Sequence, residues 1–184
     1  IVIKKLLAKC DFMILGGGIL NTFLKAKGEE IGKSLYEEDL VKEAENILSS
    51  ELSSKIIFPI DLSCESESKP KNIDVCNISK NDIIFDIGEK SLTLIKSIIN
   101  KSSAIFWNGP LGYVEKKPFD QGTIELAKSI AEHNCFSIIG GGDTLPIIEN
   151  LNLQSQYSCL STGGGSLLTY LEGGYLPILD KLDL

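Results

Sequence analysis

"SIIGGGDTLP", residues 137–146, joins a run of apolar residues to three glycines and then to an acid–hydroxyl pair. Glycine loses more conformational freedom on folding than any other residue, so three in succession require a reason. The apolar run predicts a buried strand, and the residues after Asp143 predict the start of a helix. Two other stretches, "FMILGGGILN" (12–21) and "LSTGGGSLLT" (160–169), repeat the pattern. We interpret the three junctions as parts of one ligand-binding surface.

Apolar runs of strand length alternate with helical segments along most of the chain. Strands are predicted over 12–15, 55–60, 82–88, 103–107 and 135–139, and helices over 19–27, 38–52, 90–101 and 122–133. This alternation predicts a three-layer α/β domain with a mainly parallel sheet. Ligands of such sheets bind outside the carboxyl ends of the strands, where all three glycine triplets fall. The charged, serine-rich stretch 61–81 has no clear period and is predicted to be a solvated surface loop.

The composition narrows the classes of function. The 184 residues carry a net charge of −7, which disfavours nucleic acid and anionic membrane surfaces as partners. No apolar stretch is long enough to span a bilayer, and five cysteines without a C-x-x-C pair favour reduced thiols in the cytoplasm. All 18 basic residues are lysines, so a phosphate must be held by backbone N–H groups, lysines or a metal rather than by forked arginines. The chain begins inside a predicted helix and without a methionine, so we expect a fragment.

The acid–hydroxyl pair after the second triplet has two interpretations. Asp143 is either an N-cap of the following helix or a ligand of a magnesium ion on a polyphosphate, with Thr144 touching the phosphates. Familiar phosphate motifs are excluded: "KGEEIGKS" (27–34) has three residues between Gly28 and Gly32 where a Walker loop has four. The G-x-G-x-x-G spacing is also missing after the strands, which disfavours a nicotinamide-dinucleotide enzyme.

The stretch "AIFWNGPLGYVE" (104–115) carries the most specific pattern. A strand ends near Trp107, and the turn residues that follow describe a long loop between a strand and a helix. That loop is either only a connection or the source of an amide from Asn108, an apolar wall from Pro110 and Leu111, and a carboxylate from Glu115 that accepts from ribose hydroxyls.

Six motifs occur in a fixed order: "FMILGGGILNTFL", "IGKSL", "FDIGEKSL", "WNGPLGYVE", "IIGGGDT" and "STGGGSLLTYLEGGYLP". Together they resemble the C-terminal, nucleotide-binding half of the phosphoglycerate kinase family, essentially from end to end. The resemblance implies one Rossmann-like domain over residues 1–184, half of a two-domain kinase, truncated at its N-terminal side and without the substrate-binding domain. It also implies reversible transfer of a phosphoryl group between 1,3-bisphosphoglycerate and ADP, with Mg²⁺, to give 3-phosphoglycerate and ATP in glycolysis.

The resemblance further implies a role for each junction residue. The nucleotide-binding set is Gly17, Gly18, Gly88, Asn108, Pro110, Leu111, Glu115, Gly141, Gly142, Asp143 and Thr144. Within it, the glycines of the first junction, Gly88 and Leu111 line the adenine and Glu115 binds the ribose. Asn108 and Thr144 lie near the phosphates, and Asp143 is the metal ligand. The catalytic set, which meets the transferring phosphoryl group as negative charge develops on it, is Gly163, Gly164 and Gly165.

The chain also departs from the family pattern. Members carry a glycine–lysine motif just before the point where this chain begins, and an arginine-rich phosphoglycerate site in the other half. We therefore expect the chain alone to be a monomer that binds ADP or ATP weakly and does not catalyse transfer, with phosphoglycerate bound through the missing domain. Two alternatives stay open: a non-catalytic adenine-nucleotide-binding module, and a purely structural α/β domain whose glycines are only turns.

Overall fold

The structure is a computed structural model, and it describes residues 2–171 and 173–174. The end of the sixth motif, residues 172 and 175–177, lies outside the described residues. The helices are α1 (Val2–Leu7), α2 (Gly17–Ala26), α3 (Val41–Leu48), α4 (Glu89–Ile99), α5 (Gln121–His133), α6 (Leu145–Asn150) and α7 (Gly164–Leu171). The strands are β1 (Met13–Ile14), β2 (Ile56–Ile57), β3 (Asp61–Ser66), β4 (Lys69–Asp74), β5 (Ile83–Ile87), β6 (Ala104–Asn108), β7 (Phe136–Gly140) and β8 (Cys159–Ser161).

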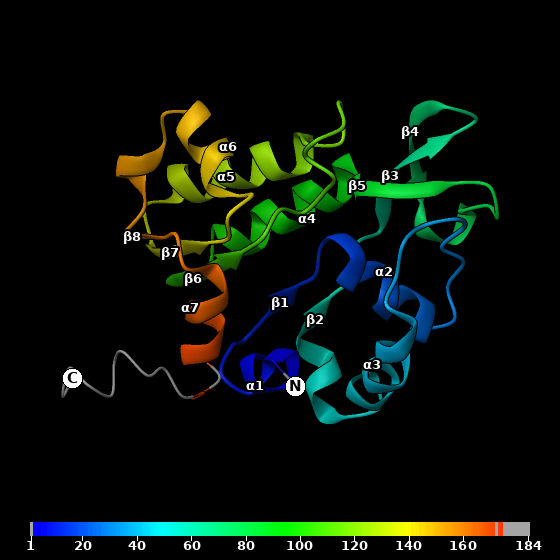
Figure 1. Cartoon of the computed structure of the whole chain (residues 1–184), viewed down its shortest axis with the longest axis horizontal. Helices are drawn as coiled ribbons and strands as arrows, with labels where there is room; N and C mark the ends of the chain where they lie inside the picture. The colour runs from blue at the N-terminus through cyan, green and yellow to red at the C-terminus, as the bar shows by residue number, and fades with distance from the viewer. Residues whose placement is uncertain (1, 172, 175–184) are drawn as a thin grey trace.

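The strands form three small sheets between helices. β1 pairs with β2, and β6, β7 and β8 pair in that order, all in parallel. The third sheet has the order β4-β3-β5 and is antiparallel. In Figure 1, α4, α5 and α6 lie on one side of the parallel strands, and α1, α2 and α3 lie on the other. The predicted α/β class is confirmed, whereas the antiparallel sheet was not predicted.

Helical periodicity explains why the main helices form where they do. In α5, the buried residues Thr123, Leu126, Ala127 and Ile130 recur at intervals of three and four, which places them on one face of the helix. α5 ends at His133, and its C-cap residue Asn134 has a left-handed backbone with φ 52°, a frequent conformation at a helix C-terminus. The chain then turns directly into β7, so α5 fixes where that strand begins.

The prediction of a solvated loop over 61–81 was wrong for residues 61–74. β3 and β4 form a hairpin, and the side chains of Leu62 and Cys64 on β3 are fully buried. The two turn residues, Glu67 and Ser68, both have positive φ, as the favoured two-residue hairpin turns require. The sequence did not reveal the hairpin for two reasons. Its turn lacks the Asn-Gly pair that usually marks such a turn, and its strands are charged and rich in serine.

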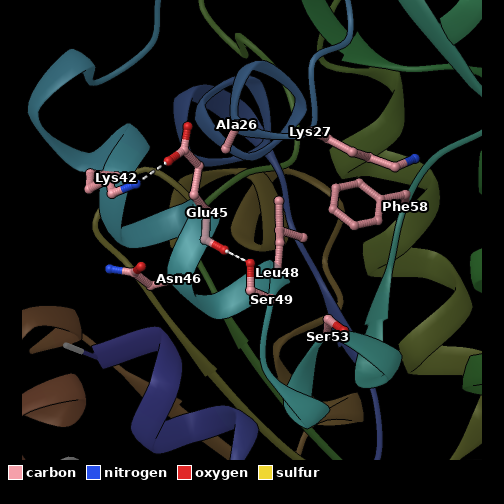
Figure 2. Close-up of a pocket in the computed structure, with 9 residues that line it drawn as sticks. All are labelled: Ala26, Lys27, Lys42, Glu45, Asn46, Leu48, Ser49, Ser53 and Phe58. Atoms are coloured by element: carbon pink, nitrogen blue, oxygen red, sulfur yellow. Dashed lines mark hydrogen bonds and ion pairs between the residues drawn. The ribbon is translucent and has the colours of Figure 1, made fainter.

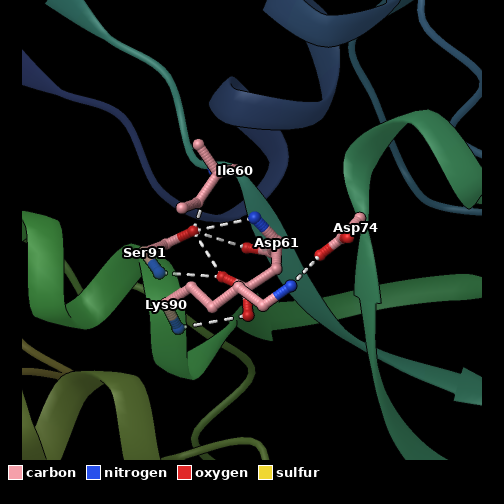
Figure 3. A network of polar contacts seen from close by, with 5 residues as sticks. All are labelled: Ile60, Asp61, Asp74, Lys90 and Ser91. Carbon is pink, nitrogen blue, oxygen red and sulfur yellow. Dashed lines mark hydrogen bonds and ion pairs between the residues drawn. The ribbon is translucent and has the colours of Figure 1, made fainter.

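The buried carboxylate of Asp61 on this hairpin supplies the cap that α4 lacks (Figure 3). α4 follows Gly88, which has no side chain, and Asp61 accepts the N–H groups of Lys90 at 3.1 Å and Ser91 at 2.8 Å. The Ser91 hydroxyl lies 2.6 Å from the same carboxylate and accepts the N–H of Ile60 at 2.9 Å. A Cβ on Gly88 would overlap this carboxylate, so the helix start depends on both residues.

Removing this cap should destabilise the fold strongly. Asp61→Ala leaves the buried N–H of Ser91 and the partly buried N–H of Lys90 without their acceptor, so we expect the free energy of unfolding to fall by about 2–4 kcal/mol. The matched control is Asp74→Ala, which removes only the exposed ion pair with Lys90 at 2.7 Å and should change stability by less than about 1 kcal/mol. Urea denaturation measures both, and similar losses in the two variants would contradict the capping role.

Candidate functional site

The carboxyl ends of β6, β7 and β8 bring three loops together. The parallel register pairs Asn108 with Gly140 and Gly140 with Ser161, so the last residues of the three strands lie side by side. The N–H of Gly109 also donates to the carbonyl of Gly140 at 3.3 Å. The loop after β6, the second glycine triplet and the third glycine triplet therefore begin at the same edge of one sheet.

At this edge the backbones approach so closely that side chains would not fit. A Cβ on Gly140 would lie 2.8 Å from Oδ1 of Asn108, and a Cβ on Gly164 would lie 3.0 Å from the same atom and 2.9 Å from the nitrogen of Gly141. Gly141 itself has φ +105°, and a Cβ there would lie 2.9 Å from the nitrogen of Gly109. The second and third junctions are thus packed on each other around the Asn108 amide.

Two buried polar atoms at this packing centre have no hydrogen-bond partner. Among the described residues, the buried side-chain atoms without a partner are Asn21 Oδ1, Asn108 Oδ1 and Thr144 Oγ1. Burying such an atom unpaired costs about 1–3 kcal/mol, so natural structures keep few of them without a reason. Thr144 belongs to the second glycine junction and Asn108 is the residue on which the second and third junctions pack, which indicates a place where polar groups of a ligand can complete the bonding.

The structure separates the roles of Asp143 and Thr144. Thr144, which is fully buried, is the N-cap residue of α6, and no side chain makes a cap hydrogen bond there. Asp143 lies one residue earlier and is exposed to solvent. The alternative in which Asp143 caps α6 therefore receives no support, and its carboxylate is accessible at the junction.

The first triplet joins the site through the loop after β6. The N–H of Gly17 donates to the carbonyl of Leu111 at 2.9 Å, and a Cβ on Gly16 would lie 2.9 Å from the Cα of Leu111. Gly17 and Gly18 are exposed, with open space where a side chain would stand, while Leu111 is buried. The first and second junctions therefore contact the loop after β6, at Leu111 and at Gly109, and the third contacts Asn108, the last residue of β6.

Other members of the predicted set lie in different surroundings. Pro110 is partly buried between Gly109 and Leu111, whereas Glu115 is exposed farther along the same loop. Gly88 is buried against Asp61, at the end of β5. Gly163 precedes α7 and is exposed, as is Gly165 inside it.

Sequence reasoning missed two buried polar residues that hold the loop. Asp86 on β5 accepts the N–H of Gly122 at 2.7 Å, and the hydroxyl of Thr123 accepts the N–H of Leu111 at 3.0 Å. Burial raises the pKa of Asp86 to about 7 and the negative charge of Asp120 acts in the same direction, although the N–H bonds lower it. A charged residue inside the apolar run "IIFDIG" was the available signal, because aspartate is rarely buried without a role.

A separate groove of about 560 Å³ lies between α2 and α3, at the opposite end of α2 from Gly17 (Figure 2). It is lined by Ala26, Lys27, Lys42, Glu45, Asn46, Leu48, Ser49, Ser53 and Phe58. Two of its charges already pair with each other, Lys42 with Glu45 at 2.9 Å, and Lys27 lies over the ring of Phe58. Since none of the glycine junctions reaches this groove, we place the candidate site at the junctions.

The described residues contain neither a cluster of side chains suited to a metal ion nor a helix suited to a membrane. Within residues 2–171 and 173–174, no group of three or more histidine, cysteine, aspartate or glutamate side chains is arranged to hold a metal ion. None of the helices in these residues has the length and apolar character that crossing a membrane requires. A metal at Asp143 would therefore need most of its ligands from a bound molecule and water.

Comparisons with known proteins all lead to one family. A family model described as phosphoglycerate kinase matches residues 1–174. The phosphoglycerate kinase of Francisella philomiragia is 42% identical over 98% of this chain and 48% of its own length, and that of Legionella pneumophila is 44% identical over 96% and 46%. The chain thus spans about half the length of these curated relatives.

Solved structures give the same result. The phosphoglycerate kinase from Coxiella burnetii superposes with a TM-score of 0.92 at 37% identity, covering 99% of this chain and 48% of that one. The enzyme from Pyrococcus horikoshii superposes with a TM-score of 0.86 at 30% identity and the same coverage. The fold of this chain is therefore similar to about half of each of these structures.

Neighbouring glycines of the third triplet should differ in their tolerance of a methyl group. Gly164→Ala places a Cβ against Gly141 and Asn108, so we expect the free energy of unfolding to fall by about 1–3 kcal/mol. Gly165→Ala meets open space inside a helix and should be neutral or stabilising by up to about 1 kcal/mol. Equal effects in urea denaturation would show that the second and third junctions do not touch.

The titration of Asp86 should make stability depend on pH. Its pKa is about 7 in the folded chain and 3.8 in its ordinary state, so between these values the folded chain holds a proton that the unfolded chain has released. The stability that the protonated Asp86 carboxyl contributes to the folded chain is therefore fully present below about pH 4, and it is lost as pH rises through about 7. Relative to Asp86→Asn, the unaltered chain should lose stability from about pH 4 to about pH 7, by up to about 1.4 kcal/mol per pH unit. Urea denaturation at a series of pH values measures both proteins. Parallel profiles of stability against pH for the unaltered chain and Asp86→Asn would contradict the raised pKa.

Proposed function

Because the chain belongs to the phosphoglycerate kinase family, we propose that it is the nucleotide-binding half of such an enzyme. In the complete protein it would act in glycolysis, where a phosphoryl group passes reversibly between 1,3-bisphosphoglycerate and ADP to give 3-phosphoglycerate and ATP. The phosphoglycerate would bind through the half that this chain does not cover. The observation that carries the proposal is that the three glycine junctions all contact residues 108–111, at the end of β6 and in the loop after it, beside the unpaired Asn108 and Thr144 atoms.

The phosphates are assigned to the edge formed by β6 and β7. Gly142 is exposed, with open space where a side chain would stand, and the hydroxyl of Thr144, which lacks a partner among the described residues, could donate to a phosphate oxygen. Without arginine, the chain has no forked guanidinium group for a phosphate, and backbone N–H groups and a hydroxyl are donors that it can offer at this edge. The residues present fit a phosphate-bearing ligand.

A magnesium ion bound with the nucleotide would neutralise part of the phosphate charge. Its protein ligand would be the accessible carboxylate of Asp143, because Mg²⁺ commonly takes one or two carboxylates and completes its shell with substrate phosphates and water. This matches the finding that no cluster of three suitable side chains occurs among the described residues. Asp143 would thus align the metal–nucleotide complex without a preformed metal cage.

The nucleoside is assigned to the other side of the loop. Leu111 and Pro110 would form an apolar wall beside the open backbone of Gly17 and Gly18, and Gly88 would complete the adenine wall. Glu115 is exposed on the same loop, where its carboxylate could accept hydrogen bonds from ribose hydroxyls. From Glu115 back to Asn108, the loop would thus contact the ribose, the adenine and the phosphates in turn.

The transferring phosphoryl group is assigned to the start of α7. Gly163, Gly164 and Gly165 would present N–H groups to the negative charge that develops during transfer. Phosphoryl transfer requires position and charge stabilisation more than covalent chemistry from the protein, and rigid backbone donors supply both. The contact of Gly164 with Gly141 would hold these donors at a constant distance from the phosphate site.

The test is calorimetric titration of ADP with and without magnesium. The chain should bind ADP more tightly with magnesium, and Asp143→Asn should weaken only the magnesium-dependent part, by roughly ten- to a hundred-fold, as expected for the loss of a contact to a charged group. The matched control is Glu149→Gln, an exposed carboxylate at the other end of α6, which should leave binding unchanged. An Asp143→Asn variant with normal magnesium-dependent affinity would contradict the metal role.

The alternative of a non-catalytic nucleotide-binding module makes the same binding prediction. It differs in the behaviour of the complete protein, which would bind ADP but show no transfer in a coupled assay with 3-phosphoglycerate and ATP. A purely structural domain would bind no nucleotide at all, with or without magnesium.

A further inference from the structure

We propose that Asp86 is a positioning residue for the nucleoside end of the site: its buried carboxylate holds both ends of the loop 112–122, and thereby sets the place of Leu111. This inference rests on the proposed function, because it assigns Leu111 to the adenine wall. Asp86 lies on β5, beneath the loop, and does not belong to any glycine junction. It would act on the ligand only through the loop.

The carboxylate of Asp86 occupies space that two glycines leave open. A Cβ on Gly112, at the start of the loop, would overlap it, and so would a Cβ on Gly122, at the end of the loop. The N–H of Gly122 donates to Oδ2 at 2.7 Å, so the end of the loop is also hydrogen-bonded to it. One side chain therefore contacts both ends of a segment that carries Glu115 between them.

The residues next to these two glycines connect the loop ends to the proposed adenine wall. Leu111 precedes Gly112, Thr123 follows Gly122, and the N–H of Leu111 donates to the Thr123 hydroxyl at 3.0 Å. The carbonyl of Leu111 in turn accepts the N–H of Gly17 at 2.9 Å. A shift of the loop ends would therefore move Leu111 relative to the first glycine junction.

The same carboxylate also reaches the end of β5. Its Oδ1 accepts the N–H of Ile87 at 2.8 Å, and the next residue is Gly88, the other member of the proposed adenine wall. Asp120, whose charge acts on Asp86, pairs with Lys117, and Lys116, which lies over the ring of Phe85, pairs with Glu65 at 2.6 Å. Asp86 thus connects the two adenine-wall segments, while the lysines nearby are occupied by other carboxylates.

The loop has a second, apolar attachment that does not involve Asp86. The ring of Phe85 stacks on Tyr113 with centroids 5.6 Å apart and packs on Phe119 at 4.8 Å, and the N–H of Tyr113 donates to the carbonyl of Phe85 at 2.7 Å. These contacts should keep the loop folded when Asp86 is altered. A change at Asp86 is therefore expected to shift the adenine wall more than it unfolds the loop.

The experiment compares two probes that share phosphates but not the nucleoside: ADP and inorganic pyrophosphate, each with magnesium. Asp86→Asn should weaken ADP binding at least fivefold in calorimetric titration and leave pyrophosphate affinity within twofold. Asp82→Asn is the control, because Asp82 is a buried aspartate near the other end of β5 that accepts the N–H of Ser79 at 2.7 Å. It should leave both affinities within twofold even where it lowers the melting temperature.

If Asp86→Asn does not fold, a second variant tests the same connection between the loop ends and Leu111. Thr123→Val keeps the size of the side chain but removes the hydroxyl that Leu111 donates to, and it should weaken ADP without weakening pyrophosphate. Equal losses for ADP and pyrophosphate, or an unchanged ADP affinity in the folded variants, would overturn the positioning role. If the unaltered chain binds neither probe, the proposed function fails and the inference falls with it, which is distinct from a failure seen only in the variants.

Discussion

The close approach of three backbones at the carboxyl ends of β6, β7 and β8 is the constraint on which the rest of the site depends. Gly140, Gly141 and Gly164 have no room for a side chain because the Asn108 amide and the neighbouring main chain occupy that space. A parallel sheet brings strand ends together, but only residues without a Cβ allow the following loops to touch. The contact leaves backbone as the main surface for a ligand, which suits a chain that contains no arginine.

Side chains beneath the surface support this exposed backbone. Asp61 lies under Gly88 and caps α4, and Asp86 lies under Gly112 and Gly122. In both places a buried carboxylate fills the space that a glycine leaves and accepts N–H groups that would otherwise be unpaired. Burial raises the pKa of Asp86 to about 7, because desolvation disfavours the charged form of its carboxyl group. Such an arrangement separates the groups proposed to meet the ligand from the groups that hold them.

The sequence predicted the parts of the fold in which local pattern and tertiary environment agree. The alternation of β5, α4, β6, α5 and β7 was predicted within a few residues, because buried strands and amphipathic helices have distinct periods. The hairpin of β3 and β4 was not, because its turn at Glu67 and Ser68 lacks the usual turn residues. The glycine junctions were recognisable from composition alone, whereas the supporting aspartates were not, since their role depends on contacts about 30 residues away along the chain.

The most direct test of the account is the pattern of backbone amide shifts on titrating ADP with magnesium into the isotopically labelled chain. If the glycine junctions form the phosphate site, the amides of Gly141, Gly142 and Gly164 should shift together, with the indole signal of Trp107, whose N–H donates to Gly109. The amides of Glu45 and Ser49, in the groove between α2 and α3, should stay in place. Shifts confined to that groove, with the junction glycines unchanged, would contradict the account.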